Sequence, residues 1–204
     1  MTSAPSQGYA YGPNSDCPLN PITPLSATPS TVLTGINAMA AQGGTNITEG
    51  AAWGFRVLSP GAPFTEGNAY GATTAKVIIL MTDGENTAYQ MSNMNNSAFD
   101  SAYAYPYNGR NNVRLGTVTW SNTQLQNEMN ARLTTVCNNA KNLGIVIYTI
   151  GVDTVNTSNP SANTALLTGC ASDSSKAFFP ATASDLQAAF VSIANQLAAL
   201  RIEQ

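Results

Sequence analysis

The sequence predicts an α/β fold in which a mostly parallel sheet is flanked by helices. Two apolar runs, KVIILMT at residues 76–82 and IVIYTIGV at residues 145–152, are typical of strands that a parallel sheet buries on both faces. Around these runs, apolar residues recur at steps of three and four, which predicts helices. A chain in which strands and helices alternate forms a parallel sheet with helices on both faces.

The amino-terminal stretch, residues 1–30, is dense in proline, which predicts an extended lead-in. Within it, residues 22–25 are predicted to form a short edge strand. Ser30 is then expected to cap a helix that ends at Gly43. The apolar side chains of this helix follow helical spacing, at Val32, Leu33, Ile36 and Met39.

Residues 43–46 (GGTN) form the next predicted loop, and a second helix follows it. Asn46, with Glu49 three residues later, has the spacing of a helix N-cap. Apolar residues continue on one helical face until Pro60, which ends the helix.

The second half of the chain continues the alternation. Residues 87–120 are rich in Asn, Ser and Tyr without a clear period, which predicts a long insertion of the kind that often carries function. The remaining predicted elements are helices at 121–144, 161–167 and 184–200 and an edge strand at 177–179. Residues 31–204 are therefore predicted to form one α/β domain.

The composition argues against several classes of function. With 8 Lys and Arg, 11 Asp and Glu and a net charge of -3, the chain lacks the basic surface that binds nucleic acid. It has no histidine, which excludes Ser-His-Asp and Cys-His catalysis and His-ligated zinc. Its longest aliphatic run, residues 77–81, is far shorter than the roughly 20 residues that cross a bilayer.

Asp83 directly follows the first predicted strand, at the end where open α/β sheets bind ligands. Glu85 comes two residues later, and carboxylates are suitable ligands for hard cations such as magnesium. The hydroxyl of Thr45 is a second suitable oxygen, in a loop whose glycines permit close approach. The plainer interpretation is that Thr45 and Asp83 cap helices or turns.

Two of these segments resemble a known metal site. GTN at residues 44–46, followed by LMTDGEN at residues 80–86, resembles the second and third parts of the metal-ion-dependent adhesion site of von Willebrand factor A (vWA) domains. The resemblance implies a Rossmann-like vWA fold that binds magnesium or manganese directly or through water. It makes Thr45 and Asp83 metal ligands and places Asn46, Glu85 and Asn86 on the rim of the ligand site.

A narrower resemblance covers most of the chain. The segments CP at 17–18, GTNI at 44–47, WGFR at 53–56, LSP at 58–60 and CAS at 170–172 resemble the Tad (Flp) pilus-assembly proteins. Those are bacterial proteins with an exported A domain behind an amino-terminal membrane segment. The resemblance implies an extracytoplasmic location and protein partners in the envelope or the pilus machinery. Membrane anchoring is expected only through a segment upstream of this chain.

The chain departs from the vWA pattern in one respect. The family's first metal motif, Asp-x-Ser-x-Ser, follows the first central strand, and no such motif occurs in this sequence. The chain is therefore expected to lack that strand, either as a fragment or as a natural short form. In both cases this chain supplies at most the second and third parts of the metal site.

The chain has three cysteines, Cys17, Cys137 and Cys170. An odd count in an exported protein suggests one disulfide and one cysteine without its partner, whereas the plainer interpretation is three buried thiols. Because the resembled family is exported, we favour a Cys137–Cys170 disulfide. Cys17 is then free or paired with an upstream residue.

Three functions follow from these observations. The first is a non-catalytic binding or assembly module whose ligand rim includes Thr45, Asp83 and the 87–120 insertion. The second is a magnesium-dependent phosphatase-like hydrolase with Asp83 as nucleophile or metal ligand. That class also needs a lysine near the phosphate, and Lys76 lies at the opposite end of the strand. The third is a structural subdomain that has lost metal binding.

Overall fold

The computed structural model describes residues 2–3, 10–11, 20–41, 44–71, 74–87, 122–152 and 160–200. The chain divides into two compact units, and each is described by itself. The first unit comprises residues 1–45 and 87–128, and the second comprises residues 46–86 and 129–204.

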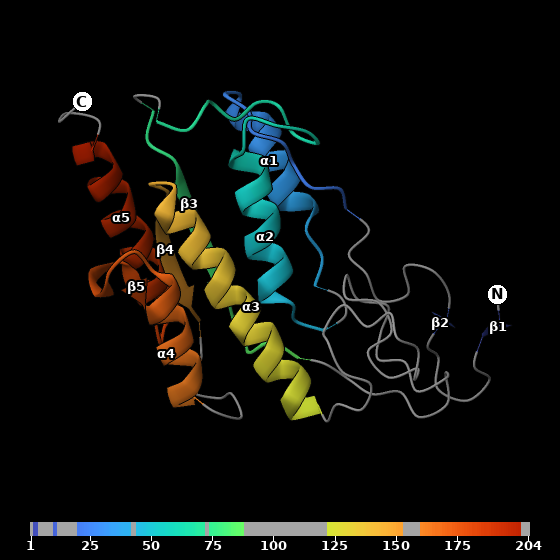
Figure 1. Ribbon diagram of the computed structural model, residues 1–204. Helices are drawn as coiled ribbons and strands as arrows, with labels where there is room; N and C mark the ends of the chain where they lie inside the picture. The colour runs from blue at the N-terminus through green and yellow to red at the C-terminus, as the bar shows by residue number, and fades with distance from the viewer. Residues whose placement is uncertain are drawn as a thin grey trace. The chain divides into compact units, whose positions relative to one another are not determined.

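The second unit is built on a parallel three-stranded sheet. Its strands are β3 (Val77–Thr82), β4 (Val146–Gly151) and β5 (Ala177–Phe178), in the order β3-β4-β5. All neighbours are parallel, with Val77 opposite Val146 and Thr149 opposite Ala177. Figure 1 shows the three strands side by side, with β4 between the other two. The predicted parallel α/β sheet is confirmed.

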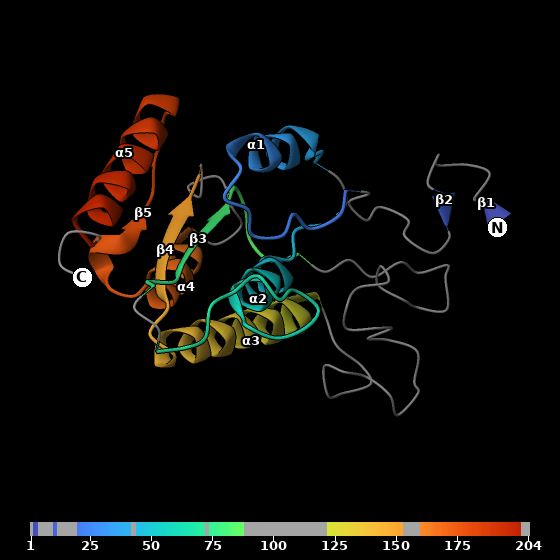
Figure 2. The same ribbon diagram turned by 90° about the horizontal axis from the view of Figure 1, so that it is seen from above.

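Helices cover both faces of this sheet (Figures 1 and 2). They are α2 (Ile47–Leu58), α3 (Asn122–Asn142) and α4 (Pro160–Cys170) on one face and α5 (Ala183–Leu200) on the other. On the first face, Leu80 and Ile147 of the strands lie in a buried cluster with Ile47, Leu133 and Cys137. On the second face, Tyr148 and Ile150 of β4 pack against Ile193 of α5. All four helices appear close to where the sequence predicts them.

One prediction about the strands is wrong. β4 is buried on both faces, as expected, but β3 is buried on one face only. Ile79 and Met81 point toward the α5 side of the sheet and are 41% and 54% exposed. Because α5 packs over β4 and the start of β3, these two side chains lie beyond its cover.

The first unit contains the hairpin strands β1 (Thr2–Ser3) and β2 (Ala10–Tyr11) and the helix α1 (Pro29–Ala38). The predicted strand at residues 22–25 is wrong, because this stretch has no strand pairing. Pro21 and Pro24 remove backbone donors that a ladder needs.

The predicted limits of α1 are also wrong. Thr28 occupies the N-cap position instead of Ser30, since Pro29 has the fixed φ that suits the first helical turn. The helix ends at Ala38, well before Gly43. None of its residues is buried: Val32, Leu33 and Ile36 are exposed, and so is Met39 at the C-cap.

Within the described ranges, no helix is both long enough and apolar enough to cross a membrane. The predicted insertion at residues 87–120 lies outside the described residues except for Thr87, and so does Cys17.

Candidate functional site

Asp83 lies immediately after β3, at the edge where the parallel strands end. The turn that presents it is closed by Thr82, whose buried hydroxyl receives a hydrogen bond from the Gly84 amide at 3.2 Å and donates to the Gly84 carbonyl at 3.1 Å. The Val152 amide donates to the Thr82 carbonyl at 2.8 Å, which fixes the end of β3 against the end of β4. The Asp83 side chain is exposed and Glu85 is half-buried. The structure therefore presents one carboxylate directly to solvent at the ligand-facing edge.

Asn86, a predicted rim residue, is fully buried. Its Oδ1 accepts a hydrogen bond from the Ile47 amide at 2.8 Å, which satisfies a donor in the first turn of α2. Its Nδ2 donates to Oδ1 of Asn130 on α3 at 2.9 Å. Asn86 thus links the loop after β3 to two helices. No periodic pattern predicts this role, because the residue lies in a loop.

Asn46 has the capping role that its spacing predicts. Its Oδ1 accepts a hydrogen bond from the Glu49 amide at 3.0 Å, and Asn46 is the N-cap of α2. Thr45, one residue earlier, is half-buried. Its amide donates to the Thr87 hydroxyl at 2.8 Å, and its carbonyl accepts from the Thr87 amide at 2.9 Å. These bonds hold the backbone of the Thr45 loop from both sides.

The described donors do not complete a metal site. Magnesium takes about six oxygen ligands in near-octahedral geometry. Within the described segments, no cluster of three or more His, Cys, Asp or Glu side chains has the geometry to hold a metal ion. Asp83 and Glu85 on one loop and the Thr45 hydroxyl on another are candidate ligands. Whether any predicted site residue binds a ligand stays a prediction.

The lysines near the sheet donate hydrogen bonds to backbone carbonyls, and among the described residues neither Lys76 nor Lys141 has a hydrogen bond or ion pair with Asp83. Lys76 is buried at the start of β3, and its Nζ donates to the carbonyls of Leu58 at 2.5 Å and Asn68 at 2.6 Å. These bonds tie the end of α2 to the loop that follows it. On α3, Lys141 Nζ donates to the Gly169 carbonyl at 2.7 Å. Neither ammonium is placed to bind a phosphate at the carboxyl edge of the sheet.

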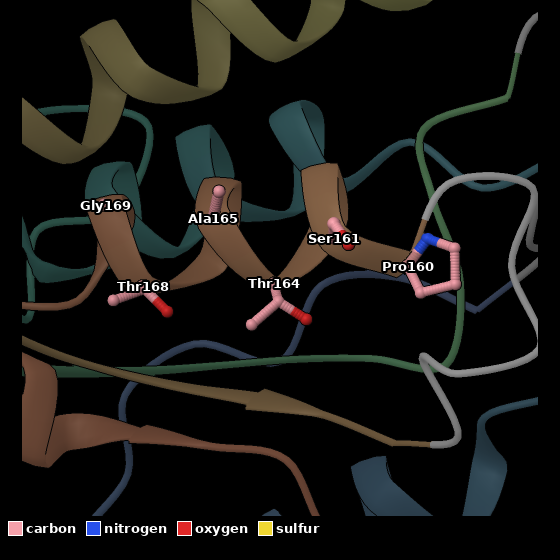
Figure 3. Close-up of a pocket in the computed structure, with 6 residues that line it drawn as sticks. All are labelled: Pro160, Ser161, Thr164, Ala165, Thr168 and Gly169. Atoms are coloured by element: carbon pink, nitrogen blue, oxygen red, sulfur yellow. The ribbon is translucent and has the colours of Figure 1, made fainter.

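The outer face of α4 lines a shallow, open hollow with small side chains, Pro160, Ser161, Thr164, Ala165, Thr168 and Gly169. Figure 3 shows Thr164 and Thr168 projecting from the same side of the helix. The lining has no charged group. On the inner face of α4, Nδ2 of Asn163 is buried and has no hydrogen-bond partner among the described residues. Neither feature forms a polar site comparable to the Asp83 edge.

The predicted disulfide is confirmed. Cys137 of α3 and Cys170 of α4 are bonded, with their Cα atoms 5.1 Å apart. Both residues are buried in the cluster on the first face of the sheet.

Asp173 is the N-cap of the short 3-10 helix η2 (Ser174–Lys176) that leads into β5. The Lys176 ammonium, 2.5 Å from Oδ2, is the main cause that holds the pKa of this carboxyl below its ordinary value of 3.8. The Ser175 hydroxyl acts in the same direction, whereas partial burial opposes it. The carboxyl is therefore ionised at neutral pH and fixes the turn before β5.

The parallel sheet with helices on both faces is a Rossmann-like α/β fold, which is the fold that vWA domains have. A solved structure supports this fold. The vWF domain of the type V pili tip protein Mfa5 from Porphyromonas gingivalis matches with a TM-score of 0.53 and 18% sequence identity, over 83% of this chain and 72% of that one. Neither models of protein families nor the sequences of curated proteins match this chain.

Proposed function

We propose that the chain is a non-catalytic binding module of the bacterial cell envelope that acts in pilus assembly or adhesion. The observation that carries the proposal is the exposed Asp83 at the ligand-facing edge of a vWA-like sheet. The similar domain of Mfa5 comes from a pilus tip protein, which supports a role on the cell surface. A buried disulfide is also typical of exported proteins.

Metal binding is part of this proposal. Asp83 would hold magnesium or manganese, and the Thr45 hydroxyl would add a ligand directly or through water. The remaining oxygens would come from a segment with the Asp-x-Ser-x-Ser pattern, which this sequence lacks. The narrower assignment to Tad (Flp) pilus assembly rests on the sequence resemblance alone.

Calorimetric titration of magnesium and manganese tests the proposal. We expect weak or no heat with this chain and saturable binding with a form extended by its encoded upstream residues. Asp83→Ala should abolish binding in the extended form, because it removes the central carboxylate. Glu66→Ala is a matched control, since Glu66 is also an exposed acid but lies in the loop after α2.

The competing functions predict different results. Turnover of p-nitrophenyl phosphate that requires Asp83 would show that the chain is a hydrolase and would contradict the proposed binding module. If the extended form binds neither metal ion and hydrolyses no phosphate ester, the third function, a structural subdomain without metal binding, is the one that agrees with the results.

A further inference from the structure

A hollow lies between the end of β5 and the first turns of α5, two elements that run side by side (Figures 1 and 2). The residues that line it are Phe178, Phe179, Pro180, Asp185, Ala188 and Ala189. Its volume of about 310 Å³ is sufficient for one long side chain. Pro180 and Ala189 are buried and form an apolar floor, whereas Phe179 and Asp185 are exposed. The hollow therefore combines apolar walls with one aromatic ring and one carboxylate at its rim.

The Asp185 carboxylate is held in place by the start of α5. Its Oδ2 accepts hydrogen bonds from the Thr182 amide at 3.1 Å and from the Thr182 hydroxyl at 2.8 Å. The Asp185 amide donates in return to the Thr182 hydroxyl at 3.1 Å. This reciprocal pair is a capping box, which fixes the first turn of a helix. Because the carboxylate is already oriented, a ligand that binds it loses little additional side-chain entropy.

The charge of the hollow favours a cation. Asp185 is the only charged residue of α5, and its lining partners are all apolar. Within the described part of the chain, Asp185 forms no ion pair. The amino-terminal end of a helix has a partial positive charge of about +0.5, which the full negative charge of Asp185 exceeds. A cationic group beside the carboxylate is therefore attracted.

Among cationic side chains, arginine fits this lining best. Its planar guanidinium stacks on an aromatic ring and can form two parallel hydrogen bonds with one carboxylate. Its aliphatic stem packs on apolar surface. The chain has one such stacked arginine of its own, since the Arg56 guanidinium lies 4.7 Å from the centre of the Trp53 ring. The ammonium of lysine is a compact charge without a planar face, and it matches the Phe179 ring less well.

We propose that the hollow between β5 and α5 binds an arginine side chain of a partner polypeptide. The stem of the arginine packs on Pro180 and Ala188, and its guanidinium contacts the Phe179 ring and the Asp185 carboxylate. A buried arginine of this kind is a common anchor in protein interfaces. The inference goes beyond the proposed metal-assisted function and does not require a bound metal ion.

The position of the hollow separates it from the proposed metal site. The upstream segment that would complete the metal site lies beside Asp83, at the β3 end of the sheet. The hollow borders β5, at the opposite end of the order β3-β4-β5. With paired strands about 4.8 Å apart, β5 is about 10 Å from β3. A strand added beside β3 therefore leaves the hollow accessible.

Nuclear magnetic resonance titration with short peptides tests the inference. The probe is the peptide GRG, acetylated at one end and amidated at the other. We expect saturable shifts of the amides of Phe179, Asp185 and Ala188, with a Kd of about 1–10 mM for this single anchor. The citrulline peptide has nearly the same shape without the charge, and it should bind at least fivefold more weakly. The lysine peptide should bind at least threefold more weakly.

Substitutions in the hollow separate charge from stacking. Asp185→Asn should weaken binding of the arginine peptide at least fivefold and remove its advantage over citrulline, while an asparagine oxygen can still accept the bonds from Thr182. Phe179→Leu keeps an apolar side chain but should remove the preference for arginine over lysine. Glu66→Gln is the matched control, since it neutralises an exposed acid in the loop after α2 and should leave peptide binding unchanged.

The same variants distinguish this inference from the proposed function. Asp185→Asn should not alter metal titration of the extended form, and the peptide shifts should be the same in this chain and in the extended form. Equal binding of the arginine and citrulline peptides would overturn the inference, and so would the absence of shifts at the hollow in either form. Methylguanidinium that binds as tightly as the arginine peptide would also overturn it, because the site would then serve a small cation instead of a polypeptide.

Discussion

At the scale of single residues, buried polar side chains outside regular elements hold the candidate site together. Asn86 satisfies an amide at the start of α2 and binds Asn130 of α3. We expect Asn86→Ala to lower the free energy of unfolding by about 1–3 kcal/mol, because it leaves buried polar groups without a partner. Asn130→Ala, which spares the bond to Ile47, should cost less. Urea denaturation would measure both, and equal losses would contradict the capping role.

The turn before β5 has a charge with a defined pH response. Because the pKa of Asp173 is lower in the folded chain than its ordinary value of 3.8, the carboxylate contributes stability fully above about pH 4. That contribution is lost as the pH falls through the folded pKa. The melting temperature of Asp173→Asn should therefore be lower than that of the parent at pH 7, with a difference that shrinks below pH 4. A constant difference down to pH 3 would rule out this ionised pair.

The site was only partly predictable from individual residues. The spacing of Asn46 and Glu49 identified the N-cap of α2, because capping depends on residues three apart in sequence. The burial of Asn86 and the carbonyl partners of Lys76 depend on residues distant in sequence, and no local pattern encodes them.

At the scale of elements, hydrophobic periodicity predicted the helices and strands of the second unit. The errors in element position lie in the proline-rich region, and one error in burial concerns β3. Ser30 matched a general N-cap preference, but the adjacent Pro29 determined where α1 starts. The predicted burial of β3 on both faces failed because an apolar run does not reveal how much of each face a helix covers.

The disulfide is the strongest link between two elements. It joins α3 to α4 across a separation of 33 residues, and closing a loop of that length in the unfolded chain stabilises the fold by about 3 to 4 kcal/mol. Replacing Cys137 and Cys170 together with alanine should lower the free energy of unfolding by about this amount. Urea unfolding of the parent with and without reductant should show a similar change. An unchanged midpoint would contradict the estimate.

At the scale of the whole molecule, the order of strands and helices along the sequence predicts the fold class. It does not predict the identity of the ligand. A solvent-exposed carboxylate after a parallel strand marks a candidate binding edge. It does not specify what binds there, because the same edge serves many ligands on related folds.

The alternation along β3 has a consequence for how this segment tolerates change. Ile78 and Leu80 face the core under α2, while Ile79 and Met81 face solvent. Replacing every position in turn should therefore produce a profile of folding defects that rises and falls with a period of two.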